Sequence, residues 1–347
     1  MVEFVSGDIL KVDAEAIVNT VNTKGVMGKG IALQFKKAFP EMFAAYKKEA
    51  QAGKILVGHM QVYEQPEILG PKFIINFPTK NDWRKPSKIE FIKEGLDDLV
   101  KVIREYRISS IAIPPLGCGQ GGLNWADVAP LIEFALKQVP EVKTFVFQPL
   151  GAPKPSEMIN RTERPKLTLS RAVVLKLLKQ YCVLGYELTL LETQKLLYFL
   201  QEAGEPLKLK FQKQIYGPYA DNLRHVLSLF EGHFTEGFGD GQNKPDTQIK
   251  ILPGAMEEAT DYLKDQENNS HIIRLAKVEE LIEGFESPYG MELLSTVHWV
   301  VAKDSVSSEN TDAVISAVQG WNTRKKALMK PEHIKIALTQ LKEKNWV

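Results

Sequence analysis

The chain has 347 residues, too many for one ordinary domain, and this length predicts two domains. Hydrophobic residues make up 44% and charged residues 25% of the sequence, which excludes a disordered or fibrous chain. The formal net charge is +1, from 44 basic and 43 acidic side chains, so no overall cationic field holds nucleic acid or a membrane non-specifically.

The cysteine and histidine content excludes several kinds of site. Cys118 and Cys182 are too few for a disulfide framework or a four-sulfur zinc site. The histidines form no HxxxH or similar ligand pair, so no metal and no cofactor are expected. The N-terminus has early acidic residues and no signal-peptide pattern, and no apolar run approaches about 18 residues. We therefore expect a cytoplasmic protein with free thiols and no membrane partner.

Strand-like and helical segments alternate over residues 1–150. Strands are predicted at Glu3–Val5, Ala16–Thr20, Met60–Tyr63, Phe73–Phe77, Ser110–Ile113 and Thr144–Gln148. Helices are predicted at Gly30–Phe39, Glu41–Gln51, Lys88–Tyr106 and Asn124–Gln138. This alternation predicts an α/β sandwich with a mostly parallel or mixed sheet, in which ligands bind at the carboxyl ends of the strands.

A proline-rich stretch then separates two domains. Leu150–Leu167 contains three prolines and little periodicity, so we predict a first domain at residues 1–155 and a linker at residues 156–167. Residues 168–347 form a mostly α-helical second domain. Its predicted helices are Ser170–Leu184, Leu190–Ala203, Tyr219–Phe230, Gly254–Gln266, Ile272–Phe285, Tyr289–Ala302, Asp312–Gln319 and Pro331–Lys344. A weak strand or hairpin is predicted at Leu207–Gln214 and Gln248–Leu252.

Three glycines follow the second predicted strand and precede a helix, in the sequence NTVNTKGVMGKGIALQFKK. They are Gly25, Gly28 and Gly30. Glycine lets backbone N–H groups approach an anion closely, and a helix that begins at Lys29–Gly30 points its positive end at the same place. The order is neither that of a dinucleotide-binding loop nor that of a Walker loop. The stretch predicts a phosphate-binding loop, and an ordinary glycine-rich turn is the alternative.

A second glycine-rich stretch, PPLGCGQGGLNW, also follows a strand and precedes a helix. Two such loops on one sheet edge can close over a diphosphate from both sides, so the pair predicts pyrophosphate binding more specifically than either loop alone. Asp8, in the GDI sequence after the first strand, can accept a hydrogen bond from an exocyclic amine such as that of adenine. The alternative is an aspartate that initiates a turn.

These motifs together resemble the macrodomain family, the ADP-ribose-binding proteins with a three-layer α/β/α fold and a mixed sheet. The resemblance is carried by GDI, NxVN, GxxGxGIAxxF and GCGxGGLxW over about residues 1–155. More narrowly, NTVNTKGVMGKGIALQFKKAFP and NFPTKNDWRKPS are similar to the antitoxins that are paired with DNA ADP-ribosyltransferase toxins. The resemblance implies hydrolysis of the N-glycosidic bond between ADP-ribose and a thymidine base of single-stranded DNA, with ADP-ribose as product.

The same resemblance implies the roles of individual residues. Lys80 would be catalytic, and Asn22 would touch the ribose nearest the reacting bond. As an aromatic residue close to Lys80 in the sequence, Trp83 would cover the site or stack on a base of the strand, and a partly buried loop anchor is the alternative. The remaining implied substrate contacts are Asp8 and Ile9 at the adenine; Gly28, Lys29, Gly30, Ile31 and Ala32 on one side of the diphosphate; Gly117, Cys118, Gly119, Gln120, Gly121 and Gly122 on the other; and also Thr20 and Gly25.

The family's relatives that act on protein carboxylates combine a lysine at this place with an aspartate in a loop that reads GCGxDxLxW. The matching position here is Gly121, so the chemistry shifts onto Lys80, Asn22 and the substrate itself. Lys80 would act either as an ammonium beside the leaving thymine or, as the resemblance favours, as a neutral amine that attacks the anomeric carbon. The attack requires a lowered pKa. Without the resemblance, Lys80 would be interpreted as a surface lysine, and Cys118 as a small buried thiol.

The second domain resembles an antitoxin domain whose signature is a QKLLYF helix followed by YGP. The resemblance implies that residues 168–347 bind and neutralise a DNA ADP-ribosyltransferase toxin. The segment Glu257–Asp312 has 13 acidic and 4 basic residues, a balance of −9. An acidic helical face can occupy a DNA-binding groove as a DNA mimic, and solvated helix faces are the alternative. Two other functions stay open, a non-catalytic ADP-ribose reader and a hydrolase that acts on protein side chains.

Overall fold

The computed structural model of the protein describes residues 2–66, 70–151, 153–182, 188–241, 243–264 and 270–347. The chain divides into two compact units. The first comprises Met1–Glu163 with Gly239–Gln242, and the second comprises Arg164–Phe238 with Asn243–Val347. Gly239–Gln242 therefore belong to the first unit, although the sequence places them in the second domain. Each unit is described below by itself.

A six-stranded sheet forms the centre of the first unit, in the order β1-β6-β5-β2-β4-β3. Five strands run parallel, and only β3 pairs antiparallel, with β4. The strands are β1 Val2–Val5, β2 Ala16–Asn22, β3 Gln61–Glu64, β4 Phe73–Lys80, β5 Ser110–Ile113 and β6 Lys143–Phe147. This mixed sheet confirms the predicted sheet type.

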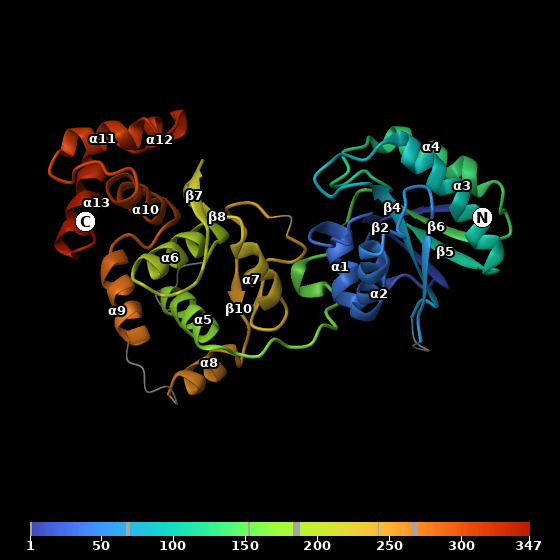
Figure 1. Cartoon of the computed structure of the whole chain (residues 1–347), viewed down its shortest axis with the longest axis horizontal. Helices are drawn as coiled ribbons and strands as arrows, with labels where there is room; N and C mark the ends of the chain where they lie inside the picture. Colours follow the sequence, from blue (N-terminus) through green and yellow to red (C-terminus); the bar gives the residue numbers. More distant parts are fainter. Residues whose placement is uncertain (1, 67–69, 152, 183–187, 242, 265–269) are drawn as a thin grey trace. The chain divides into compact units, whose positions relative to one another are not determined.

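Helices cover both faces of this sheet (Figure 1). The helices are α1 Gly30–Ala38, α2 Pro40–Gln51, α3 Ile89–Glu105 and α4 Trp125–Leu136, with a 3-10 turn at Ile9–Lys11. One apolar cluster lies under α1 and α2, and another lies under α3 and α4. Every residue of β4 is buried, which explains why its sequence is a continuous rather than an alternating apolar run. The predicted three-layer α/β/α sandwich is confirmed.

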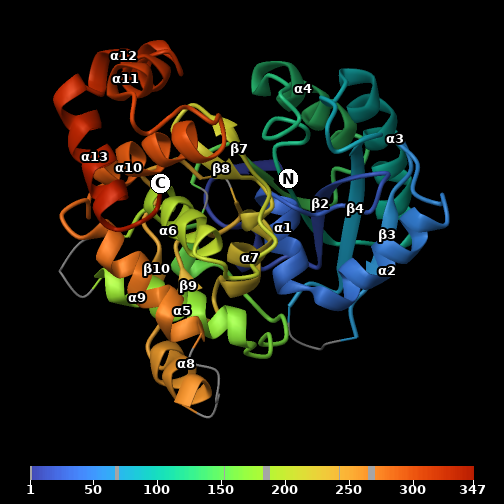
Figure 2. The ribbon, with the colours of Figure 1, turned by 60° about the vertical axis from the view of Figure 1, so that its left-hand side comes forward.

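The second unit is mainly helical, as predicted (Figure 2). Its helices are α5 Leu169–Cys182, α6 Leu190–Glu202, α7 Leu223–Phe230, α8 Ala255–Lys264, α9 Ser270–Ile282, α10 Pro288–Ala302, α11 Thr311–Gln319, α12 Thr323–Leu328 and α13 Pro331–Glu343. Two antiparallel strand pairs join β7 Phe211–Gln214 with β8 Gly217–Ala220, and β9 Thr235–Glu236 with β10 Lys250–Ile251. Residues 183–184 and 265–266, the ends of two predicted helices, lie outside the described residues.

The predicted helix Tyr219–Phe230 begins too early, because Tyr219 and Ala220 belong to strand β8. Hydrogen bonds from side chains of α6 to the backbone of this strand explain the difference. The Gln194 amide donates to Ala220 O at 3.2 Å and accepts from Ala220 N at 3.0 Å, as a neighbouring strand would. The ammonium of Lys195 donates to Pro218 O at 2.5 Å. Hydrogen bonds therefore join the helix that contains QKLLYF directly to the strand that contains the glycine and proline of YGP.

Candidate active site

Most of the predicted site residues follow parallel strands, and this topology gathers them at one edge of the sheet. The loop that holds Asp8 follows β1, and the two glycine-rich loops follow β2 and β5. Lys80 is the last residue of β4. Because β1, β5, β2 and β4 run in one direction, their carboxyl ends face the same side, where α/β sheets bind ligands.

The first loop is shaped by Asn22. Its amide Nδ2 donates to Val26 O at 2.6 Å, and its Oδ1 accepts from Lys24 N at 3.0 Å and from Val26 N at 3.4 Å. The Tyr46 hydroxyl donates to the carbonyl of Asn22, which is buried. Gly25 has φ of +76°, a left-handed conformation that favours glycine. These hydrogen bonds of Asn22 fix the conformation of the first loop. This structural role differs from the expected contact with the ribose, and the two roles are compatible.

The helix that follows this loop leaves its amides available. Lys29 precedes α1 in an extended conformation and provides no side-chain cap. The N–H groups of Ile31 and Ala32, in the first turn, donate to no acceptor among the described residues. The N–H of Gly30 differs, because it donates to the carbonyl of Asp240 at 3.0 Å, and Gln34 donates to the Asp240 carboxylate at 3.0 Å. Asp240 belongs to the first unit, and no local sequence signal points to this contact.

The second loop has a fixed shape and free amides. Gly122 N donates to Gly119 O and Leu123 N donates to Gly117 O, both at 3.1 Å. Gly117 and Gly122 have φ values of +70° and +77°. Within the described parts of the chain, the N–H groups of Gly119 and Gly121 have no acceptor. Backbone N–H groups that are fixed in place and lack an acceptor are the feature that anion-binding concavities share.

Lys80 lies between the two loops. Its ammonium donates to the carbonyl of Gln120 in the second loop, and the residue is 9% exposed. Its own carbonyl accepts from Thr23 N in the first loop at 3.0 Å. Burial lowers the pKa of Lys80 below its ordinary value of 10.5, which favours the neutral amine. Cys118 differs, because burial raises the pKa of its thiol to about 11 and keeps it protonated.

The position of the missing aspartate is filled by close packing. A Cβ atom at Gly121 would lie 2.1 Å from Gly117 O and 2.4 Å from Ser87 Oγ. The N–H of Ser87 donates to Gly121 O at 2.9 Å, and its buried hydroxyl has no hydrogen-bond partner. Ser87 therefore occupies the space that a side chain at position 121 would need, and the NFPTKNDWRKPS sequence that ends at Ser87 does not predict this contact.

Asp8 lies at the other end of the candidate site. Its Oδ1 accepts from Leu10 N at 3.0 Å and caps the turn at Ile9–Lys11. Its Oδ2 is buried without a hydrogen-bond partner, and Lys11 Nζ lies 3.8 Å away. An acceptor without a hydrogen-bond partner suits the amine of adenine. Ile9 is 3% exposed and packs in the core, and Thr20 is a half-buried residue of β2.

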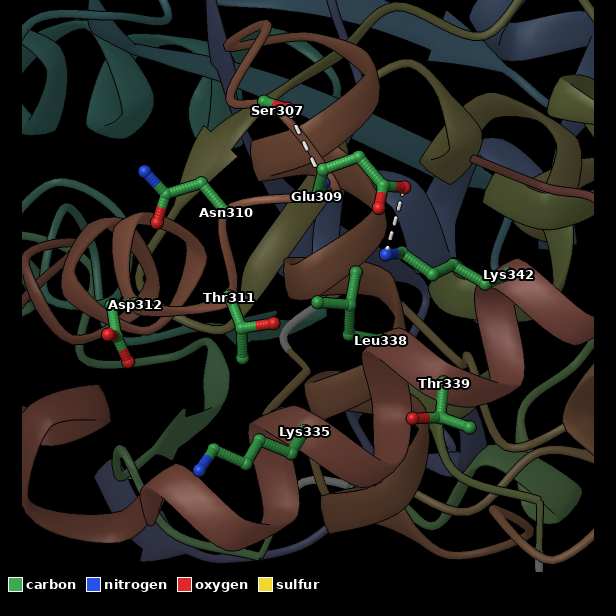
Figure 3. Close-up of a pocket in the computed structure, with 9 residues that line it drawn as sticks. All are labelled: Ser307, Glu309, Asn310, Thr311, Asp312, Lys335, Leu338, Thr339 and Lys342. Carbon is green, nitrogen blue, oxygen red and sulfur yellow. Dashed lines mark hydrogen bonds and ion pairs between the residues drawn. The ribbon is translucent and has the colours of Figure 1, made fainter.

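A separate pocket of about 840 Å³ lies in the second unit (Figure 3), beside α11 and α13. The Glu309–Lys342 ion pair, with Oε1 and Nζ 3.1 Å apart, borders it. None of the predicted site residues lines this pocket. Its lining residues are Ser307, Glu309, Asn310, Thr311, Asp312, Lys335, Leu338, Thr339 and Lys342. No described helix has the length and apolar character needed to cross a membrane.

The fold and the two loops define a macrodomain, and the Macro domain family matches residues 18–132. A DNA ADP-ribosyl glycohydrolase of Thermus aquaticus is 44% identical, over 98% of this chain and 93% of that protein. A solved structure described as the macrodomain of Mycobacterium tuberculosis DarG is 53% identical and covers 43% of this chain and 99% of that one, with a TM-score of 0.43. The chain belongs to the DNA ADP-ribosyl glycohydrolase (DarG) family of macrodomain proteins.

A third similar protein is a fusion that names two activities. A DNA ADP-ribosyl transferase-DNA ADP-ribosyl glycohydrolase fusion protein of Thermosipho africanus is 32% identical over 161 residues. The match covers 42% of this chain and 41% of the fusion protein.

Proposed function

We propose that this chain is a hydrolase that removes ADP-ribose from thymidine bases of single-stranded DNA, and that it acts as an antitoxin. The proposal rests chiefly on the position of Lys80, which lies between two loops with free backbone amides. Loops of this geometry hold a diphosphate, so the ribose that follows the diphosphate would come next to the lysine. Family membership supports the reaction class.

The chemistry requires one bond to break at the anomeric carbon of the ribose. The Nζ of neutral Lys80 would attack this carbon, and the base nitrogen of thymine would leave with the bonding electrons. The departing imide spreads its charge over two carbonyl groups, so it needs little help from a general acid. Water would then release ADP-ribose from the lysine, and the freed base nitrogen would take up a proton. The low exposure and lowered pKa of Lys80 support this route.

The decisive experiment is incubation of the chain with ADP-ribosylated single-stranded DNA. We expect free ADP-ribose and an unmodified oligonucleotide, which chromatography or mass spectrometry would detect. A non-catalytic reader would bind the DNA and release nothing. A hydrolase that acts on protein side chains would leave the ADP-ribose on the DNA but would release ADP-ribose from modified protein. Either of these results would overturn the proposed substrate.

We further propose that the second unit binds and neutralises a DNA ADP-ribosyltransferase toxin. The fusion of a transferase with a glycohydrolase in the Thermosipho africanus protein supports a link between the two activities. The acidic segment Glu257–Asp312 is not one continuous surface, because Glu292 is buried between two cations and Glu279 is half-buried. Glu257, Glu280 and Glu283 are exposed, and we propose that these three acids contact the toxin. We expect both partners in the cytoplasm.

Charge reversal tests this interface. The triple variant Glu257→Lys, Glu280→Lys and Glu283→Lys is expected to weaken toxin binding at least tenfold at moderate salt. A matched control reverses three exposed acids outside the segment, Asp246, Glu332 and Glu343, and should bind as the unmodified chain does. Equal affinity of both variants for the toxin, measured by calorimetry, would exclude the acidic segment as the contact.

A further inference from the structure

The residues after Lys80 form a tight turn that exposes an aromatic ring and a guanidinium group. Lys85 N donates to Asp82 O at 3.1 Å, and Arg84 N donates to the Asp82 carboxylate at 2.9 Å. Asp82 therefore begins the turn, and Trp83 and Arg84 occupy its two central positions. The Trp83 side chain is 40% exposed, and the Arg84 guanidinium lies 4.6 Å from the centre of its ring.

This turn is fixed beside the candidate active site at both ends. At its start, the Thr23 hydroxyl of the first loop donates to Asn81 O at 2.7 Å. At its end, Ser87 N donates to Gly121 O of the second loop at 2.9 Å. Only residues 81–86 span these two anchors, and Lys80 directly precedes them. The exposed ring therefore lies at the rim of the two loops.

The segment is also positively charged. Arg84, Lys85 and Lys88 are exposed, and none of them forms an ion pair with a described residue. The one acid of the turn, Asp82, accepts a backbone hydrogen bond from Arg84. Three cations and one carboxylate leave a local balance of +2, on a chain whose overall charge is only +1.

We propose that Trp83, Arg84, Lys85 and Lys88 form a strand-binding rim, which holds the single-stranded DNA next to the modified nucleotide. This inference rests on the proposed function and assigns a strand-binding surface to the same site. An exposed aromatic face stacks on any unpaired base, and neighbouring arginine and lysine side chains contact the phosphates. A base within a duplex is already stacked, so the rim favours single strands. An acidic peptide would satisfy the cations but would leave the ring without a stacking partner.

The test compares two substrates, an ADP-ribosylated thymidine mononucleoside and an ADP-ribosylated oligonucleotide. In the triple variant Arg84→Ser, Lys85→Ser and Lys88→Ser, we expect KM for the oligonucleotide to rise roughly tenfold or more. Hydrolysis of the mononucleoside should stay within about twofold, because it has no neighbouring phosphates. The dependence of log KM on log salt should also become shallower, by about 2 for three lost phosphate contacts. Trp83→Leu should raise KM for the oligonucleotide through lost stacking.

A matched control removes three exposed lysines from the opposite edge of the sheet. Lys101 lies late in α3, Lys137 follows α4, and Lys143 begins β6. The variant Lys101→Ser, Lys137→Ser and Lys143→Ser changes the net charge equally, and its KM and salt dependence should match those of the unmodified chain.

Each result of this experiment decides the inference. An unchanged oligonucleotide KM in the rim variant overturns it, and so does an equal loss on both substrates, which would place the side chains at the ADP-ribosyl group instead. If the unmodified chain hydrolyses neither substrate, the proposed function fails. The rim is then tested by fluorescence anisotropy with an unmodified single-stranded oligonucleotide. The inference requires that the oligonucleotide has a higher affinity for the unmodified chain and for the control variant than for the rim variant.

Discussion

Asn22 and Lys80 face each other in register across the parallel strands β2 and β4. The register shifts just before this pair, because Val21 is opposite Pro78 and Thr79 is skipped. Such an irregularity re-aims the side chains at the end of a strand. Here it brings Lys80 level with the residue that orders the first glycine loop, so the lysine and the loop are positioned by the same strand pair.

Substitution of Lys80 separates its two possible roles. A lysine that acts only through its charge would be partly replaced by arginine, whereas an attacking amine would not, because the guanidinium group stays protonated. We expect Lys80→Arg and Lys80→Ala to lower kcat by a similar factor, of about 100 or more, while ADP-ribose binding persists. The measurement is single-turnover release of ADP-ribose. Turnover of Lys80→Arg close to that of the unmodified chain would rule out the covalent route.

The pH dependence of the rate provides an independent check. Burial lowers the pKa of Lys80 from 10.5, so the neutral amine becomes abundant at a lower pH than for an exposed lysine. If the amine attacks, kcat rises with pH and levels off once the lowered pKa is passed. If the ammonium is required, kcat falls over the same interval. We expect the rise, measured with the modified mononucleoside so that DNA binding does not contribute.

The sequence predicts the sheet and the glycine loops well because both depend on local patterns. The strands of the first unit are short apolar runs between turn residues, and the parallel arrangement follows from the helices between them. The contacts of Ser87 with Gly121 and of Gly30 with Asp240 are not predictable in this way, because each joins backbone groups far apart in the chain. The same limit explains Tyr219, whose helical spacing is overridden by the bonds from Gln194 and Lys195 to strand β8. The roles of the site residues remain predictions.

Gly121 should not accept the aspartate that lysine-dependent relatives carry. Its Cβ would lie 2.1 Å from the carbonyl of Gly117, so Gly121→Asp is expected to distort the second loop rather than add a catalytic acid. We expect a loss of about 1–3 kcal/mol in the free energy of unfolding and weaker binding of ADP-ribose. Gly119→Ala is the control, since a Cβ there meets nothing within 4 Å. Equal thermal stability of both variants would contradict the packing argument.

Asp8 should contribute to affinity through the adenine alone. Asp8→Asn keeps the oxygen that accepts from Leu10 N but replaces Oδ2, which has no hydrogen-bond partner, with a donor that cannot bind an amine. A hydrogen bond to a charged group contributes about 1.5–3 kcal/mol, so affinity for ADP-ribose should fall roughly 10- to 100-fold. Ribose 5-phosphate, which lacks adenine, should bind both proteins equally in a calorimetric titration. An equal loss for both ligands would place Asp8 away from the adenine.

Lys195 should make the stability of the second unit depend on pH. Complete burial, with a further contribution from Lys325, lowers the pKa of Lys195 from 10.5 to about 7. Between these values the unfolded chain binds a proton that the folded chain lacks, so the free energy of unfolding rises with pH, by at most about 1.4 kcal/mol per unit. Lys195→Met should flatten this slope, whereas Lys179→Met, on the exposed side of α5, should not. Urea unfolding of the full chain, followed by hydrogen exchange of α6 peptides, measures both, and equal slopes would show that Lys195 stays protonated in the fold.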